Sequence, residues 1–211
     1  MKSTEIHRRS IQGKAFWVLL LLFSCVVIAG CSQKGTAENT GVSAVEPLDE
    51  KNKKAIQAVI VKEFNAPDKE YRELRHAAME NLEDVANQEE FAVYKETPVY
   101  KTYADYMKKT YASYFTENGY ADFLNINPAF MYSVYEGSYK LNASDIKINA
   151  SKTEPTLYNF SFQVEHQDES SEKSQYKFEG TAIVPEEGKI GEIEFLDKEG
   201  LKQKLNRANA N

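Results

Sequence analysis

Cysteine, histidine and tryptophan are scarce in this chain, and their scarcity argues against several kinds of site. The 211 residues include two cysteines, Cys25 and Cys31, three histidines and a single tryptophan, Trp17. Zinc sites bring several cysteine or histidine ligands together, so the composition disfavours a zinc protein. Asp and Glu are abundant but match no calcium-loop spacing. We therefore expect no metal and no cofactor.

Common catalytic and nucleotide-binding motifs are also missing. The sequence has no Ser-His-Asp or Cys-His arrangement and no glycine-rich phosphate loop, and its ten glycines are scattered at predicted turns. With 26 basic and 32 acidic residues the net charge is −6, which is a poor match for nucleic acid. A local basic cluster, Lys51-Asn52-Lys53-Lys54, is interpreted as a solvated helix face.

The first thirty residues have the pattern of a secretion signal. Four basic residues at positions 2–14 oppose a single acidic one, Glu5. The apolar run 15–30 follows, interrupted only by Ser24. As a helix it would measure about 24 Å, short of the roughly 30 Å hydrocarbon core of a bilayer. This length favours a removable signal peptide over a permanent span.

The apolar run ends in Ile28-Ala29-Gly30-Cys31, which resembles the lipobox of bacterial lipoproteins. That motif is an aliphatic residue, a small residue, glycine or alanine, and the cysteine that takes a diacylglyceryl group. The resemblance implies cleavage before Cys31 and palmitate-type acyl chains that hold the protein on the extracellular face of the cell membrane. Two acyl chains anchor firmly where one is marginal.

Cleavage before Cys31 would change the composition of the mature protein. Cys25 would be removed, so no intramolecular disulfide is expected. Residues 1–30 carry four basic residues and one acidic residue, so the remainder has 22 and 31 and a net charge of −9. Residues 31–46 are small and polar and should form a flexible tether. Residues 47–211 are then long enough for a single domain with its own core.

The first half of this domain has helical periodicity. Ile56, Val59, Ile60 and Phe64 form one apolar stripe, and 65–68 is a break before a second helix. The stripe of that second helix is Tyr71, Leu74, Ala78 and Leu82. A third helix is predicted from about Tyr100 to Glu117, ended by Asn118-Gly119, with a short helical turn at 120–124. Residues 83–98 show no regular pattern.

The second half changes to a period of two, which is typical of strands with one buried face. Tyr158, Phe160, Phe162 and Val164 alternate with polar residues, and 176–184 follows the same pattern. A turn at 185–188 leads into a returning strand, an earlier strand covers 139–148, and a helical turn at 200–205 closes the domain. The short connections predict antiparallel neighbours. The fold class is therefore α+β, with helices on a curved antiparallel sheet of three to four strands.

Three stretches carry a family resemblance: AIQAVIVKEFNAPDKEYREL, YFTENGYADFL and FEGTAIVPEEGKIGEIEF. With this order of elements, the chain resembles nuclear transport factor 2-like proteins with the cystatin-like cone fold, and most closely the extracellular members from Gram-positive bacteria. Enzymes of this fold, such as ketosteroid isomerases and dehydratases, place an Asp, His or Tyr inside the cone. No motif here maps onto them residue by residue.

Aromatic residues supply the candidate pocket. Four tyrosines of the third helix and four aromatic residues of the strands have periods that let the two sets face each other. Such walls suit a small apolar ligand or a protein interface, or they simply form the core. The eight are Tyr103, Tyr106, Tyr111, Tyr114, Tyr158, Phe160, Tyr176 and Phe178.

His166 is the only histidine of the sheet region, with Glu165 and Asp168 nearby. A histidine beside a carboxylate could act as a base or a ligand, but we interpret it as a strand-end histidine next to a polar loop. His76 is expected on the surface. An enzyme would use His166, Tyr106, Tyr114 or Tyr158 as its catalytic candidates.

The resulting expectation is a lipid-anchored extracellular protein with a non-enzymatic domain. That domain, a monomer or homodimer, would bind an envelope protein or a small apolar ligand, and no nucleic acid. Two alternatives stay open: a small isomerase- or dehydratase-type enzyme of the cone fold, or a structural accessory of envelope, conjugation or sporulation machinery.

Overall fold

The computed structural model describes residues 48–80, 82, 85–127 and 129–209. All of them belong to one contact unit, Ala44–Asn211. The predicted signal peptide, the lipobox with Cys31 and the tether lie outside the described residues. The described elements, in chain order, are α1 (Leu48–Phe64), α2 (Lys69–Glu80), α3 (Gln88–Tyr94), α4 (Pro98–Tyr111), the 3-10 turn η1 (Ala112–Tyr114), α5 (Glu117–Ile126), the 3-10 turn η2 (Met131–Ser133), β1 (Tyr139–Ala150), β2 (Leu157–Asp168), β3 (Lys173–Ile183), β4 (Glu192–Asp197) and α6 (Leu201–Asn209).

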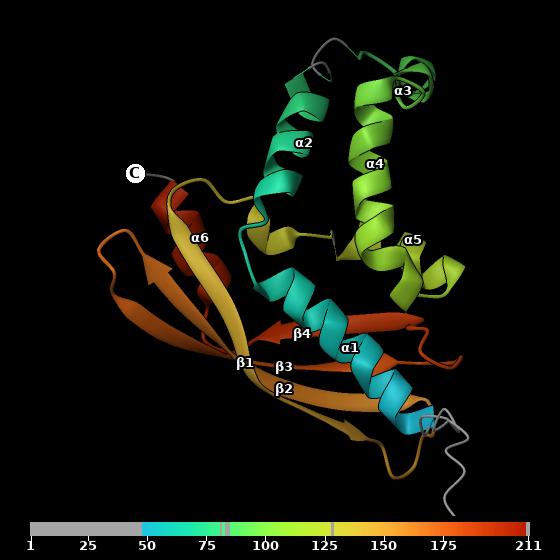
Figure 1. Cartoon of the computed structure of the whole chain (residues 1–211), viewed down its shortest axis with the longest axis vertical. Coiled ribbons are helices and arrows are strands. Elements are labelled where there is room, and N and C mark those ends of the chain that lie inside the picture. The colour runs from blue at the N-terminus through green and yellow to red at the C-terminus, as the bar shows by residue number, and fades with distance from the viewer. Residues whose placement is uncertain (1–47, 81, 83–84, 128, 210–211) are drawn as a thin grey trace, which may run out of the picture. The chain divides into compact units, whose positions relative to one another are not determined.

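The four strands form one antiparallel sheet in the order β1-β2-β3-β4, and this confirms the predicted α+β class (Figure 1). Tyr158, Phe160, Phe162 and Val164 of β2 are all buried on one face. The side chains between them are more exposed. The alternation in the sequence therefore identified the inner face of this strand correctly.

Helix α1 packs on the inner face of the sheet through its predicted stripe. Ile56, Val59, Ile60 and Phe64 are fully buried. The Phe64 ring centroid lies 4.7 Å from that of Phe162 and 4.8 Å from that of Phe178, both in edge-to-face geometry, which is a favoured arrangement for aromatic pairs. Figure 1 shows α1 lying across the strands.

The basic cluster in α1 is not simply a solvated face. Asn52 is buried, and it donates a hydrogen bond from Nδ2 to the Tyr158 hydroxyl at 2.9 Å. Its Oδ1 accepts from the backbone N–H of Gly188 at 2.8 Å. Position 52 is four residues before Ile56, so it lies on the buried stripe.

The predicted third helix corresponds to α4 and η1, and the helical turn predicted at 120–124 lies within α5. Helix α4 ends at Tyr111, and α5 begins after Thr116, whose side chain caps it by accepting from the Gly119 N–H at 3.0 Å. Asn118-Gly119 is therefore not a stop signal, and the predicted helix end is wrong. A Cβ on Gly119 would lie 2.5 Å from the Ile190 carbonyl oxygen, so this glycine lets α5 approach the β3–β4 connection closely.

Helix α3 lies in the region that showed no regular pattern. Asn87 caps it, because its side chain accepts from the N–H groups of Glu89 and Glu90, each at 3.0 Å. The Glu90 carboxylate in turn accepts from the Ala86 N–H at 2.8 Å. This reciprocal arrangement resembles a capping box. It is a local signal that the apolar pattern alone did not reveal.

Candidate functional site

The two predicted aromatic sets do not share one cavity. Tyr106 stacks on Phe130, with 5.7 Å between ring centroids, and Tyr111 meets Phe130 edge-on at 5.0 Å. Phe162 and Phe178 instead contact Phe64 of α1. Helix α1 and residues 130–132 therefore occupy the space between α4 and the sheet. The prediction that the two sets face each other is wrong, because periodicity gives a face but not its partner.

The remaining predicted pocket residues are also dispersed. Tyr103 contacts Tyr71 and Tyr100. Tyr114 is half-buried in η1, with the Lys62 ammonium 5.9 Å from its ring centroid. The Phe160 ring, on the inner face, packs directly against Gly180. A Cβ added to Gly180 would lie only 2.4 Å from Cζ of this ring.

The four catalytic candidates likewise have separate partners. Tyr158 is bonded to Asn52. The Tyr106 hydroxyl lies 3.0 and 3.1 Å from the two carboxylate oxygens of Asp68. Burial is the main cause that raises the Tyr106 pKa, and the Asp68 hydrogen bond raises it further. A phenol held in this way is a poor base near neutral pH.

His166 is buried, although it lies only two residues from the end of β2. Its ring centroid is 6.4 Å from that of Tyr139 and 6.3 Å from that of Tyr176. Its Nδ1 has no hydrogen-bond partner in the described part of the chain. Burial lowers the pKa of His166, Lys204 lowers it further and Asp168 opposes the change. His166 thus lies near the end of its strand, as predicted, but it is buried beside the Tyr139 and Tyr176 rings. His76 is exposed, as expected, and its Nδ1 lies 3.3 Å from Glu80.

Glu63 is an interior carboxylate that the sequence reasoning missed. It is 1% exposed, and its Oε2 accepts from the Tyr111 hydroxyl at 3.0 Å and from the Phe130 N–H at 2.9 Å. Burial raises the pKa of Glu63 to about 7, although both hydrogen bonds lower it. Its position in the sequence could have revealed it. Glu63 follows Val59 by four residues and therefore lies on the buried stripe of α1.

The carboxylate of Glu63 has a visible structural role. Phe130 adopts the left-handed backbone conformation with φ of 60° at the start of η2, which is unusual for a bulky residue. The hydrogen bond from its N–H to Glu63 holds this residue in place, and the Phe130 ring stacks on Tyr71 with 4.3 Å between centroids. Glu63 thus joins α1 to α4 and to the segment that fills the interior.

A second polar seam joins α2 to the segment before β1. The Ser133 hydroxyl accepts from the Asp68 N–H at 2.9 Å. Arg72 donates to the Ser133 carbonyl at 2.8 Å and also to the Tyr135 carbonyl. Its guanidinium carbon lies 5.2 Å from the centroid of the Tyr139 ring. The Arg72 guanidinium and the Ser133 hydroxyl therefore form hydrogen bonds within the protein.

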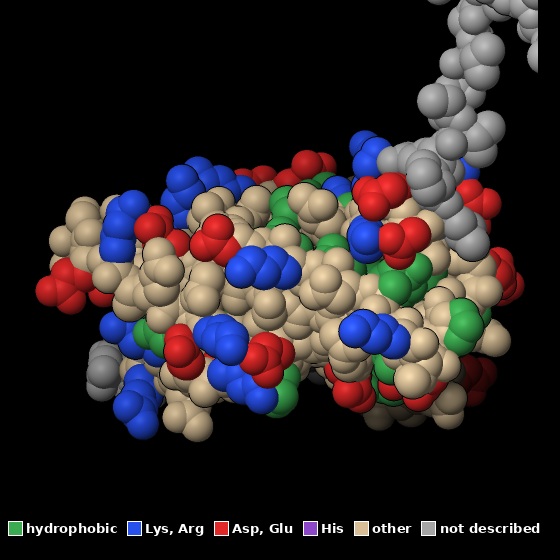
Figure 2. Space-filling model, turned by 90° about the horizontal axis from the view of Figure 1, so that it is seen from below, with side chains coloured by type: hydrophobic (Ala, Val, Ile, Leu, Met, Phe, Trp, Pro, Cys, Tyr) green, Lys and Arg blue, Asp and Glu red, His purple; other side chains and the backbone are tan. Residues whose placement is uncertain are grey.

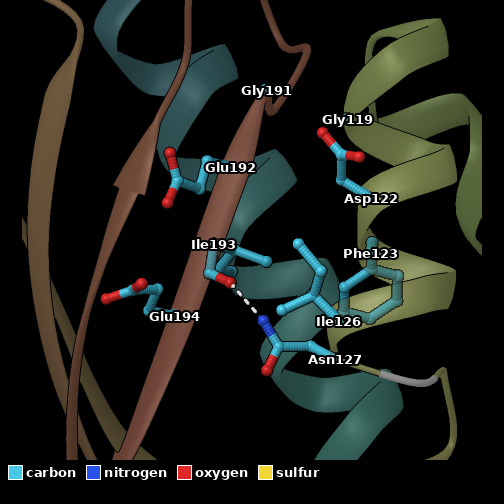
Figure 3. Close-up of a pocket in the computed structure, with 9 residues that line it drawn as sticks. All are labelled: Gly119, Asp122, Phe123, Ile126, Asn127, Gly191, Glu192, Ile193 and Glu194. Atoms are coloured by element: carbon cyan, nitrogen blue, oxygen red, sulfur yellow. Dashed lines mark hydrogen bonds between the residues drawn. The ribbon is translucent and has the colours of Figure 1, made fainter.

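The outside of the molecule offers a groove between α5 and β4 (Figure 3). Its volume is about 330 Å³. Ile126 and Ile193 point toward each other across it, and the Asn127 amide donates to the Ile193 carbonyl oxygen at 3.0 Å. Ile126 is 73% exposed, which is high for an isoleucine. The groove is lined by Gly119, Asp122, Phe123, Ile126, Asn127, Gly191, Glu192, Ile193 and Glu194.

The outer face of the sheet is polar by contrast. Between its buried residues, β2 presents Asn159, Ser161, Gln163 and Glu165 on that face. Figure 2, which views the molecule from below Figure 1, shows a surface of mixed charge with scattered hydrophobic side chains. This face lacks the extended apolar area that marks a hydrophobic interface.

The residues that the structure describes include no group of three or more His, Cys, Asp or Glu side chains able to hold a metal ion. None of the described helices combines the length and the apolar character needed to cross a bilayer.

The fold and the groove define an α+β domain with an aromatic core and a small apolar surface groove. No family model, curated protein or solved structure matches the chain. The resemblance to nuclear transport factor 2-like proteins therefore stays a prediction from the sequence.

Proposed function

We propose that the protein is a lipid-anchored extracellular lipoprotein whose domain binds an envelope protein without catalysing a reaction. The anchor is the predicted diacylglyceryl group on Cys31. The described domain begins with α1 at Leu48, so it would follow the lipidated cysteine after a short segment. This arrangement suits a module that meets partners close to the membrane.

The filled interior is the observation that carries the binding proposal. Tyr111, Phe64, Phe130, Phe162 and Phe178 are all less than 2% exposed. Among them, Glu63 accepts hydrogen bonds at Oε2 from Tyr111 and the Phe130 N–H, and its Oε1, which has no hydrogen-bond partner among the described residues, is enclosed with it. A catalytic site needs its acid or base within reach of substrate. The surface groove beside α5 therefore supports binding better than the enclosed carboxylate supports catalysis.

Lipid attachment is tested by replacing the predicted acceptor. We expect Cys31→Ala to abolish incorporation of radiolabelled palmitate and to release the protein from the membrane fraction or leave it uncleaved. Cys25→Ala is the matched control, because that cysteine precedes the predicted cleavage point and should not affect labelling. Globomycin should block processing of the wild type. Unchanged labelling of the Cys31→Ala protein would refute the anchor.

Partner binding is tested in the native membrane with a photoreactive benzophenone amino acid placed at Ile126. Val93 is a second probe position on another part of the surface, because it is 69% exposed and lies on α3. A discrete crosslinked product from either exposed position supports a binding domain. A purified protein that turns over a substrate while its surface forms no crosslink would favour the enzyme alternative.

A further inference from the structure

Strand β4 is an edge of the sheet, because it pairs with β3 alone in the described part of the chain. The register shows which of its backbone groups face outward. Lys198 donates its N–H to the Lys177 carbonyl oxygen, so Lys177 and Lys198 form a hydrogen-bonded pair. Every second pair along an antiparallel ladder is hydrogen-bonded in this way, and the pairs between are not. Ile193 and Phe195 belong to these non-hydrogen-bonded pairs. Their N–H and C=O groups therefore point away from β3.

The hydrogen bond from Asn127 agrees with this direction. It reaches the Ile193 carbonyl oxygen from the side opposite β3. The other edge of the sheet, β1, is more fully capped where it starts. There the Leu141 N–H donates to the Ala66 carbonyl at 2.7 Å, and the Ala143 N–H donates to Asn65 Oδ1 at 2.9 Å. Unpaired edge groups are templates for an added strand.

The side chains around this edge are apolar on one side and acidic on the other. On the inner side, Phe123, Ile126 and Ile193 form the apolar floor of the groove. On the outer side, Glu192 and Glu194 leave β4 away from α5 (Figure 3). Both glutamates are exposed, and neither forms an ion pair with any residue of the described ranges.

We propose that this edge binds an extended segment of a partner protein that alternates basic and apolar residues. The proposal rests on the binding function proposed above and adds its site and partner class. The segment would pair its backbone with Ile193 and Phe195, as in recognition by strand addition. Because successive side chains of a strand point to opposite faces, its basic residues would lie beside Glu192 and Glu194. Its apolar residues would then lie toward Ile126.

The Asn127 side chain already donates a hydrogen bond to one outward carbonyl of this edge, that of Ile193. An incoming N–H would replace the Asn127 amide at the Ile193 oxygen, so one hydrogen bond is exchanged for another. The two cross-strand ion pairs are the new interactions, and each pair of this kind contributes a few tenths to one kcal/mol. Charge complementarity therefore decides between a basic segment and an acidic one.

The test uses the full chain purified in a nonionic detergent and a dye-labelled, end-blocked heptapeptide of alternating lysine and valine. We expect saturable binding by fluorescence anisotropy. Binding should weaken about tenfold in the Glu192→Gln/Glu194→Gln double variant, which corresponds to two pairs of moderate strength. The matched control is Glu169→Gln/Glu172→Gln, which removes two exposed carboxylates of the β2–β3 connection. It should leave binding unchanged.

Two further probes test the backbone and the location. A peptide with N-methyl groups on every residue has no backbone N–H with which to pair along a strand and should not bind. A benzophenone at Ile126 should crosslink to the lysine-valine peptide, whereas one at Val93 should not. Absence of saturable binding, or equal loss of binding in both double variants, would overturn this proposal. In that case a crosslink to an envelope protein from Val93 would still support the general binding function.

Discussion

The buried carboxylate of Glu63 makes the stability of the domain depend on pH in an unusual direction. Most carboxylates have a lower pKa in the folded state than in the unfolded chain, but burial raises the pKa of Glu63 from 4.5 to about 7. The folded state therefore binds this proton more tightly than the unfolded state does. The resulting stabilisation is fully present below pH 4.5 and is lost as the pH rises through about 7.

The size of this effect follows from the shift. A pKa difference of one unit corresponds to about 1.4 kcal/mol, so Glu63 should cost the domain about 2–3 kcal/mol between pH 5 and pH 8. Among the described residues, the main influences on the Glu63 pKa are burial and hydrogen bonds, and the titratable groups beside it are the tyrosines Tyr71, Tyr111 and Tyr132. Glu63→Gln has nearly the same shape and does not titrate. It keeps an oxygen that can accept from the Phe130 N–H.

The assay is urea unfolding, followed by circular dichroism, of a soluble version that begins at Pro47. The free energy of unfolding of the wild type minus that of Glu63→Gln should fall by about 2–3 kcal/mol from pH 5 to pH 8. Other titrating groups cancel in this difference. The exposed control Glu172→Gln should show no such change. A Glu63 difference that stays constant to within about 0.5 kcal/mol, or that rises with pH, would refute the reasoning.

Two other substitutions test the packing. Gly119→Ala should destabilise the domain by about 1–3 kcal/mol, because its Cβ would meet the Ile190 carbonyl oxygen at 2.5 Å; Asn118→Ala in the same helix is exposed and should be neutral or slightly stabilising. A stable Gly119→Ala protein in thermal unfolding would mean that α5 does not pack closely on residues 190–191. Phe160→Ala should cost about 3–5 kcal/mol and Ser161→Ala about 0.5 kcal/mol or less in urea titrations, and equal costs would show that the facing of β2 is misassigned.

Local periodicity was enough to predict the elements whose burial follows one regular pattern. The alternation at 158–164 and the stripe of α1 each record a single buried face, so the sequence identifies strand, helix and inner side chains together. The antiparallel order of the sheet follows from the short connections. These features depend on neighbours within one element or one turn.

The environment of the tyrosines could not be predicted in the same way. The spacing of Tyr106 and Tyr111 shows that α4 has a buried face, but it does not show what covers that face. The covering residue is Phe130, held in a left-handed conformation by a hydrogen bond to Glu63 from another helix. Such a contact joins residues 67 positions apart, so no local pattern contains it.

The polar residues of the core show where pattern reasoning could have gone further. Asn52 and Glu63 both occupy positions of the apolar stripe of α1, and each is buried with long-range partners. A polar residue at an inward position of an otherwise apolar stripe indicates a buried hydrogen bond. The basic residues around Asn52 concealed that signal, because they suggested a solvated face.

Buried side chains fill the space between α1 and the sheet, so we expect partners to meet the outer surface. The most direct test is methyl NMR of the isoleucine-labelled chain under increasing xenon pressure, because xenon enters empty apolar cavities. Ile56 and Ile60 are both 0% exposed, and their methyl signals should show no saturable shift. A saturable shift of these two signals would reveal an open interior cavity and contradict the account.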